Sequence, residues 1–436
     1  MSLTLSRAFR LEKPSSVAFT GAGGKTTAIF RLARELDSPV LVTTTTHLGS
    51  EQARLADNHI ICTSNDFRTD LISGVTLVTG PKIGERWSAP SPTILEWLRE
   101  FGIINKIHLL IEADGARMKP LKAPGTHEPA IQSSVDVVVV VAGMSALGKP
   151  LSDEYVHRPR IYSRISGLAL GEPITVESLQ TVLCSPYGGL KNIPPNARRL
   201  ALITQADTPE HQARARTLAL NLSYAYHSAI ITNLGVETNV RAVYERIAGI
   251  VLAAGQATRY REPKQLLDWH GESFIRSVAR TALDAGLDPV LVISGCYADS
   301  IGQQIKDIPA QIVHNERWAE GQSTSIRAGI DALPPNTGAA IFLLADQPQV
   351  NRPVLCALRE HHAKSLAPII APLVHGERAN PVIFDRVTFS DLMSLVGDIG
   401  GRAIFKDYPV AYMPWHDDLL LSDIDLPEDY KHIYPT

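Results

Sequence analysis

Short apolar runs rich in β-branched residues recur along the chain, each followed by a glycine-rich or polar turn and then a helix-like stretch. This alternation is typical of parallel α/β architecture. Continuous valine runs such as 137–141 suit strands that helices cover on both faces, so we expect two open α/β sheets. The predicted strands are 17–20, 40–43, 107–111, 135–141, 200–203, 249–253, 289–293, 341–344 and 369–371.

The chain of 436 residues is too long for one ordinary core, because single cores stop growing at roughly 250 to 300 residues. A helix predicted over 239–246 runs almost directly into the strand at 249, with no low-complexity linker between them. We therefore expect two domains, 1–246 and 247–436. Their glycine-rich loops differ in sequence, which favours a fusion over a duplication.

Composition narrows the class of protein. A hydrophobic share of 44% with 20% charged residues is that of a soluble protein, and no apolar run is long enough to cross a membrane. Residues 1–14 lack the apolar stretch of a secretory signal, so we expect a cytoplasmic protein. A net charge of −3 argues against nucleic acid as a partner. The four cysteines lie far apart with no C-x-x-C pair, so neither a zinc site nor a disulfide framework is indicated.

A run of small residues follows the predicted strand at 249–253, and two cations come after it. Small residues let backbone N–H groups approach an anion, and strand-to-loop turns at a sheet's carboxyl edge are where such folds bind ligands. A plain turn with solvated cations would explain any one feature alone, but together they favour phosphate binding. The residues of this loop are Leu252, Ala253, Ala254, Gly255, Arg259 and Lys264.

This stretch resembles the signature of the molybdopterin nucleotidyltransferase superfamily, L-A-(A/G)-G-x-S-x-R-x-G-x-x-K, and the resemblance covers about residues 247–434. It implies a Rossmann-like domain of the nucleotide-diphospho-sugar transferase type, whose loop holds the phosphates of an NTP. Ala257 stands where serine is usual and Arg261 where glycine is usual. One hydroxyl contact and one flexible turn are therefore missing.

Two aspartates are candidate metal ligands. Asp346 follows an apolar strand, in the segment D-Q-P, where a rigid strand end can hold a carboxylate against a cation. Taken alone it is as well explained by a turn before proline. The resemblance implies that D-Q-P holds the metal, and that Asp425, in D-I-D-L-P-E-D, is the second ligand. A helix N-cap is the alternative role of Asp425.

Other segments of the second half resemble family segments that shape the base and acceptor pockets. Their amide and hydroxyl groups suit a base or a pterin, and an arginine suits an acceptor phosphate. The candidates are Asn315, Ser323, Asn380 and Arg402.

The implied reaction is attack by an acceptor's phosphate oxygen on the α-phosphorus of an NTP. Because two anions meet, the site needs charge neutralisation more than a general base: Mg²⁺ at Asp346 and Asp425, with Lys264 and Arg259 on the phosphates as catalytic residues. L-A-A-G and D-Q-P resemble the cytidylyl branch, so we expect CTP and molybdopterin as substrates. The alternatives are GTP, another phosphorylated acceptor such as a sugar phosphate, and a noncatalytic protein that delivers the molybdenum cofactor.

In the first half, a glycine-rich turn between a predicted strand and a helix ends in Gly-Lys-Thr. Amides at such a helix start, with a lysine and a hydroxyl, suit a triphosphate and magnesium. The strict P-loop pattern would place its first glycine at Phe19, so the motif is incomplete, and a tight glycine turn is the alternative. The candidate residues are Gly23, Gly24, Lys25 and Thr26, with Glu112 and Asp114 after the strand 107–111 as metal candidates.

These segments, together with residues 112–124, resemble the accessory-protein family of selenium-dependent molybdenum hydroxylases over most of 15–236. The resemblance implies a P-loop-like accessory domain with a possible second NTP. It also implies a molybdenum hydroxylase apoenzyme as partner.

Overall fold

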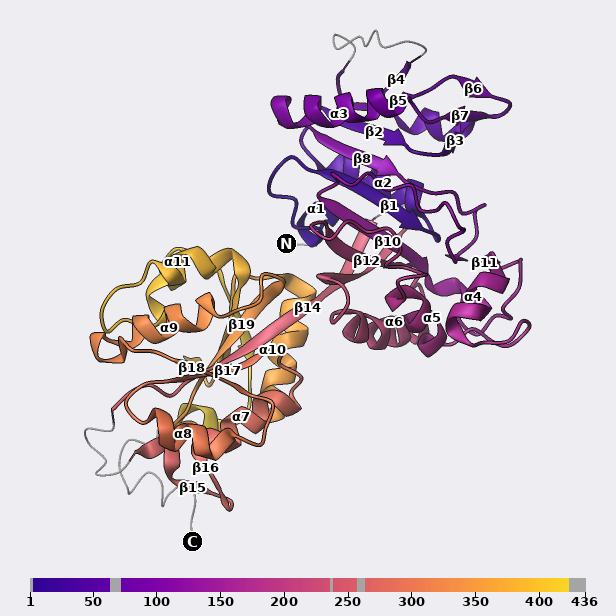
Figure 1. Cartoon of the computed structure of the whole chain (residues 1–436). Coiled ribbons are helices and arrows are strands. Elements are labelled where there is room, and N and C mark those ends of the chain that lie inside the picture. The colour runs from indigo at the N-terminus through magenta and orange to yellow at the C-terminus, as the bar shows by residue number, and fades with distance from the viewer. Residues whose placement is uncertain (1–2, 63–71, 236–237, 257–262, 423–436) are drawn as a thin grey trace. The chain divides into compact units, whose positions relative to one another are not determined.

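The computed structural model describes residues 3–62, 72–235, 238–256 and 263–422 (Figure 1). The chain divides into two compact units, Met1–Tyr244 and Glu245–Thr436. The division falls within strand β14 (Thr238–Leu252), and so does the boundary placed after residue 246 from the sequence.

The first unit is built on a parallel sheet. From β13 to β4 each strand pairs in parallel with the next, and Figure 1 shows most of these strands stacked in the order given at the end of this paragraph. All seven residues of β10 are buried, as the valine run predicts. The order is β13 (Ser228–Leu234), β12 (Arg198–Thr204), β10 (Val137–Gly143), β1 (Ser16–Gly21), β8 (His108–Glu112), β2 (Val40–Thr44), β5 (Val75–Thr79) and β4 (Asn58–Ile61).

Two helices of the first unit begin at a serine or threonine cap that proline follows. Ser91 and Thr208 each accept a backbone N–H in the first turn, and a proline occupies the first helical position after each. The helices are α1 (Leu5–Ala8), α2 (Lys25–Glu35), α3 (Pro92–Asn105), α4 (Pro159–Ser166), α5 (Val176–Cys184) and α6 (Pro209–Leu222).

The second unit has a mixed sheet. Strands β18, β17, β14 and β19 are parallel, whereas β22 is antiparallel to both β19 and β20. The reversal follows from the short turn at His375–Gly376, which folds β20 back through β21 (Glu377–Arg378). The order is β18 (Gln311–His314), β17 (Val290–Ser294), β14, β19 (Thr337–Leu344), β22 (Val382–Asp385), β20 (Ile369–Val374) and β23 (Val410–Pro414).

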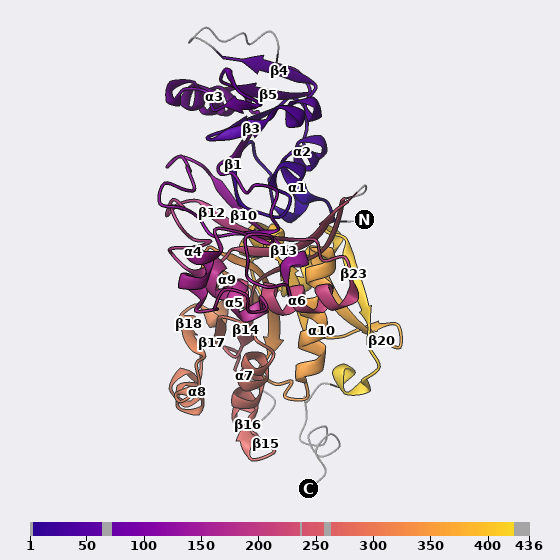
Figure 2. The ribbon, with the colours of Figure 1, turned by 90° about the vertical axis from the view of Figure 1, so that its right-hand side faces the viewer.

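Helices cover both faces of this sheet. Ile247 and Val251 of β14 pack on one side in a core with α7, α8 and α10, while Ala248 and Ile250 pack on the other with α9 and α11. Alternate residues of a strand point to opposite faces, so β14 is apolar throughout this stretch. Figure 2 shows α7 and α10, the two long helices of the first of these cores. The helices are α7 (Phe274–Asp284), α8 (Ala298–Ile305), α9 (Gln322–Asp331), α10 (Arg352–Ser365) and α11 (Phe389–Met393).

The nine strands expected from the sequence are all present, and the protein is mixed α/β. The helix expected over 239–246 is wrong, because this segment is the first part of β14. Val240, Val243 and Tyr244 are buried there, and such residues favour a strand once neighbours pack on them.

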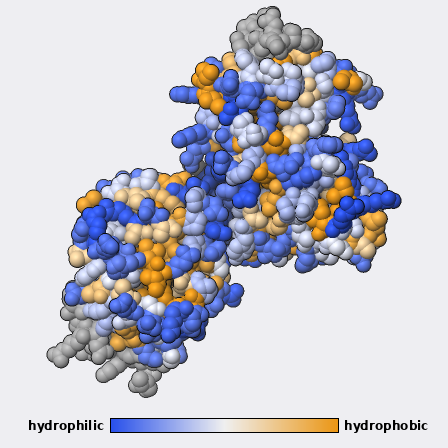
Figure 3. Space-filling model, in the orientation of Figure 1, coloured by the Kyte–Doolittle hydropathy of each residue, from blue (hydrophilic) through white to orange (hydrophobic). Residues whose placement is uncertain are grey.

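None of the helices in the described ranges is long and apolar enough to cross a bilayer. The four cysteines form no disulfide. Polar and apolar residues are interspersed over the visible face of each unit (Figure 3).

Candidate functional site

The carboxyl ends of three parallel strands coincide in the second unit. Leu252 at the end of β14 is in register with Ile293 of β17 and Leu344 of β19. The loops that leave β14 and β19 border a cavity of about 760 Å³. Its lining includes Leu252, Ala254, Gly255, Gln256, Lys264, Gln265, Trp318, Gln322, Asp346 and Asp398.

Backbone hydrogen bonds hold the small-residue loop at this edge. The amide of Ala253 donates to the carbonyl of Ile293 at 3.0 Å, and the amide of Cys296 donates to the carbonyl of Ala254 at 3.2 Å. The side-chain amide of Gln265 donates to the carbonyl of Gly255 at 3.2 Å. A β-carbon on Gly255 would meet nothing within 4 Å, so this turn is open toward the cavity.

Lysine and aspartate side chains border the same cavity from different elements. Lys264 begins the 3-10 helix η4 (Lys264–Leu266), and Asp346 comes two residues after the end of β19. The sequence-predicted residues Leu252, Ala254, Gly255, Lys264 and Asp346 are thus brought together.

Some predicted residues are placed elsewhere or not described. The side chain of Ala253 is buried in the core beneath the loop. Arg259 and Asp425 lie outside the described residues, as do the two departures from the family loop, Ala257 and Arg261.

Asn315, directly after β18, and Ser323, in the first turn of α9, are buried and do not belong to the cavity wall. The Asn315 amide donates to the hydroxyls of Thr324 at 2.8 Å and Ser325 at 3.0 Å. Ser323 has no exposed surface. A direct contact of either residue with a base or acceptor stays a prediction, and the hydrogen bonds indicate that Asn315 positions the turn before α9.

Asn380 and Arg402 line a second cavity of about 260 Å³. This cavity shares Leu252, Gln322 and Leu344 with the first one, so the two adjoin. The residues predicted for an acceptor therefore lie next to those predicted for the nucleotide.

Several residues of the cavity wall are not indicated by the sequence, among them Trp318, Gln322 and Asp398. The Asp398 carboxylate accepts the amide N–H of Gln322 at 3.1 Å, which ties the start of α9 to the loop before η7 (Gly401–Lys406). In the sequence, the glycine that precedes Gln322 is the signal that indicates this close approach. A β-carbon on Gly321 would collide with the backbone of Asp398, so only glycine permits this close approach.

In the first unit, a glycine loop joins β1 to α2. Gly21, Gly23 and Gly24 all have positive φ, at 88°, 91° and 115°. A β-carbon on Gly21 would collide with the carbonyl of Val141, so the loop passes directly against β10. This is the tight strand-to-helix turn that the sequence predicts.

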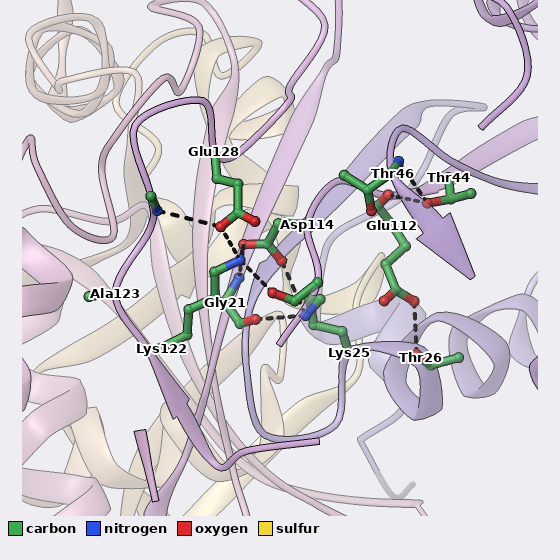
Figure 4. A network of polar contacts seen from close by, with 12 residues as sticks. Gly21, Lys25, Thr26, Thr44, Thr46, Glu112, Asp114, Lys122, Ala123 and Glu128 are labelled. Atoms are coloured by element: carbon green, nitrogen blue, oxygen red, sulfur yellow. Dashed lines mark hydrogen bonds and ion pairs between the residues drawn. The ribbon is translucent and has the colours of Figure 1, made fainter. Parts of the chain in front are cut away.

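Asp114 is the centre of a charge network beside this loop (Figure 4). Its carboxylate accepts the Gly21 amide at 3.1 Å and lies 3.1 Å from Lys25 Nζ and 2.8 Å from Lys122 Nζ. Lys122 also pairs with Glu128 at 2.7 Å. Burial raises the pKa of Glu128, but hydrogen bonds from Arg158 and Lys122 outweigh it and hold that pKa at about 2.

Lys25 is folded back onto its own loop. Its ammonium donates to the carbonyl of Gly21 at 2.7 Å, and the side chain is 4% exposed. The amides of Ala22 and Gly23 donate to the carbonyls of Val141 and Lys119. In this arrangement the first amides of the loop and the lysine bind protein groups, and an anion would have to attract Lys25 away from Asp114.

Thr26 and Glu112 form a second pair next to the loop (Figure 4). The Thr26 hydroxyl donates to the Glu112 carboxylate at 2.8 Å and accepts the Gln52 amide at 2.9 Å. Burial raises the pKa of Glu112, although Lys25 and Thr26 act in the other direction. A hydroxyl and a carboxylate at this position are the oxygen ligands that suit Mg²⁺.

Comparison with known proteins matches each unit separately. Residues 17–160 match the family model of the YqeC protein, and residues 249–412 match that of the MobA-like NTP transferase domain. YqeC of Escherichia coli (strain K12) is 31% identical over 204 residues, which cover 44% of this chain and 77% of that protein.

Two further relatives are similar to part of this chain. The purine catabolism protein PucB of Bacillus subtilis (strain 168) is 31% identical, over 43% of this chain and 95% of PucB. A Bacillus cereus (strain ATCC 10987 / NRS 248) protein named "Probable molybdenum cofactor guanylyltransferase" is 29% identical, over 30% of this chain and 64% of its own length. Through its first unit the chain belongs to the YqeC family, and its second unit is a MobA-like NTP transferase domain.

Proposed function

We propose that the second unit transfers CMP from CTP to molybdopterin and releases pyrophosphate, in the maturation of molybdenum hydroxylases. The supporting observation is the cavity at the carboxyl ends of β14 and β19, which Gly255, Lys264 and Asp346 line together. Open α/β sheets bind ligands at this edge. The name of the guanylyltransferase relative supports a molybdenum cofactor as acceptor.

The reaction is an in-line displacement. A phosphate oxygen of molybdopterin forms a bond to the α-phosphorus of CTP, the bond from that phosphorus to the bridging oxygen breaks, and pyrophosphate leaves with the electron pair. Lys264 would hold the phosphates and offset the charge that gathers as two anions approach. The loop 252–255 would fix the triphosphate through its backbone.

The oxygen ligands at this site suit Mg²⁺. Asp346 borders the cavity, and Asp425, outside the described residues, is proposed as the second ligand. When bound, the ion would supply further neutralisation of the phosphates.

CTP is proposed because L-A-A-G and D-Q-P follow the cytidylyl pattern. GTP is the second candidate, since one relative is named a guanylyltransferase. Incubation of the purified protein with Mg²⁺, molybdopterin and either CTP or GTP, followed by measurement of pyrophosphate, distinguishes the two. Faster release with GTP would refute the base assignment but leave the reaction class intact.

The same assay tests the reaction and its acceptor. Lys264→Ala is expected to lower turnover about 100-fold or more, by analogy with the loss of an oxyanion-hole donor. Lys364→Ala, which removes an exposed lysine at the end of α10, is the matched control and should retain full activity. Release only with a sugar phosphate would overturn molybdopterin as acceptor, and no release with any NTP would favour a noncatalytic delivery protein.

We also propose that the first unit binds a second NTP with Mg²⁺ at the loop 21–26. The observation in support is that Thr26 pairs with Glu112 and that the Lys25 ammonium lies against Gly21 of the same loop, so the groups a triphosphate and its ion need are close together. The first unit's link to a molybdenum hydroxylase apoenzyme is part of the same proposal.

A further inference from the structure

The smaller cavity of the second unit has an unusual wall. Apolar side chains and two arginines line it, whereas no aspartate or glutamate is among its lining residues in the described part of the chain. It adjoins the nucleotide cavity through Leu252, Gln322 and Leu344. A ligand in this cavity would therefore lie next to the proposed triphosphate site.

Three phenylalanines from separate elements form one aromatic wall. The Phe342 ring of β19 meets the Phe384 ring of β22 edge to face, with centroids 5.5 Å apart and planes at 89°. Phe384 in turn packs against Phe405 of η7 at 6.1 Å. Edge-to-face aromatic pairs keep a defined geometry, so this wall offers a preformed apolar surface for a flat ring.

Two guanidinium groups lie at the same cavity. Arg378 of β21 lies over the Phe405 ring, with Cζ 4.9 Å from the centroid, and Arg402 belongs to η7. Within the described ranges neither arginine forms a hydrogen bond or an ion pair. Burial lowers the pKa of Arg378, and the neighbouring charge of Arg402 lowers it further.

Two guanidinium charges beside an apolar wall repel each other, and a bound anion would offset that repulsion. A phosphate monoester accepts the forked N–H groups of arginine in pairs, which point charges such as lysine cannot reproduce. The side-chain amides of Asn380 and Gln322 are the uncharged hydrogen-bonding side chains of the lining, so few groups are present to bind the hydroxyls of a sugar.

We propose that this aromatic–arginine cavity (Phe342, Phe384, Phe405, Arg378 and Arg402) binds the acceptor, with its phosphate on the two arginines and a planar heterocycle against the phenylalanines. Arg378 is then a residue that determines acceptor specificity. The inference rests on the proposed transferase function and excludes a sugar phosphate as the physiological acceptor.

The kinetic test separates the acceptor from the nucleotide. Arg378→Gln is expected to raise the KM for molybdopterin tenfold or more while the KM for CTP changes less than twofold. Arg378→Lys, which keeps the charge but loses the fork, should recover only part of the loss. Arg386→Gln, which removes an exposed arginine directly after β22, is the matched control. Equal effects of Arg378→Gln on both KM values, or none on the acceptor, would overturn the assignment.

A direct binding experiment tests the ligand of this cavity independently of the proposed reaction. Titration of the full-length protein with fluorescent 6-hydroxymethylpterin phosphate should show binding that Arg378→Gln and Phe405→Ala each weaken at least fivefold and that glucose 1-phosphate does not displace. If the wild-type protein releases no pyrophosphate, the transferase proposal fails, and this titration still decides what the cavity binds. Displacement of the probe by glucose 1-phosphate as readily as by molybdopterin would refute the assignment of a planar acceptor.

Discussion

Glu112 precedes Asp114 in the sequence and Glu128 follows it, and the surroundings of the two glutamates shift their pKa values in opposite directions. Glu128 meets Lys122 and the guanidinium of Arg158, and its pKa falls to about 2. Glu112 is buried at the end of β8, and burial raises its pKa above the ordinary value. A buried carboxyl that favours its protonated form becomes a metal ligand only when a cation replaces the proton. Glu112 is therefore the residue through which pH would control the first unit's proposed magnesium site.

Glu112→Gln tests this role. Because the folded state holds the proton more tightly than the unfolded one, the carboxyl contributes less stability as pH rises above its ordinary pKa of 4.5 and through its raised pKa. Glutamine does not titrate. The variant's Tm should therefore match the wild type near pH 4 and exceed it increasingly toward pH 8, in thermal scans without ligand.

With Mg²⁺ and an NTP the order should reverse at pH 8, because only the wild type gains stability from the ligand. A Tm difference independent of pH would show that the carboxyl's titration is not involved. Thr27→Ser, a mild change one residue beyond Thr26, is the control for general perturbation of α2.

At the scale of elements, both candidate sites depend on loops at the carboxyl ends of parallel strands, and glycine fixes their paths. Gly21 has φ 88° and lies against the carbonyl of Val141. Gly84 lies outside both sites, in the turn between β6 (Lys82–Ile83) and β7 (Arg86–Ser88); it has φ 61°, and an added β-carbon would meet nothing within 4 Å. The two positions share the left-handed backbone but differ in packing.

Gly84→Ala should lower the free energy of unfolding by about 1–2 kcal/mol, the cost of a left-handed alanine. Gly21→Ala should cost a further ~1–3 kcal/mol, because β10 and the loop must move apart. Urea unfolding of the two variants measures the difference. Equal losses would mean that the close approach of the loop to β10 adds no constraint.

The elements that the sequence predicts best are the buried strands, since continuous apolar runs such as that of β10 have one explanation in this fold. The residues 239–246 were misassigned because their pattern fits a helix, and pairing in three dimensions decides the outcome. Strand β22 carries only a short run, Val382 to Phe384, β23 is only partly buried, and no run of this kind marks the antiparallel reversal.

The site residues also differ in how far the sequence alone predicts them. Asp346 stands two residues after β19, and Lys264 is the cation that follows the small-residue loop after β14; the sequence indicates both, and the structure places both at one cavity. Arg378 was not predicted, because its meaning arises only when β21, η7 and β22 fold together and bring it over Phe405. Contacts between distant segments leave no local signal in a single sequence.

At the scale of the whole molecule, the chain joins two units that each carry a candidate nucleotide loop. Lys25 belongs to the first and Lys264 to the second, and among the residues that the structure describes, the charge network around Asp114 is made of first-unit residues. Each loop is held by hydrogen bonds within its own unit. Substitutions in sites that share no partners usually have additive effects.

Crossed substitution in the full-length protein tests whether the two sites are separate. Lys25→Ala should remove NTP binding by the first unit, seen as the loss of one of two binding events in calorimetry, and leave pyrophosphate release from CTP and molybdopterin within about twofold of the wild type. Lys264→Ala should do the opposite, because it removes a charge that the transfer reaction needs while the Thr26–Glu112 pair stays in place. The double variant should show both losses with no additional effect on Tm. If Lys25→Ala slows transfer tenfold or more although CTP still binds the second unit, the two units act as one catalytic system, and occupancy of the first loop controls the second.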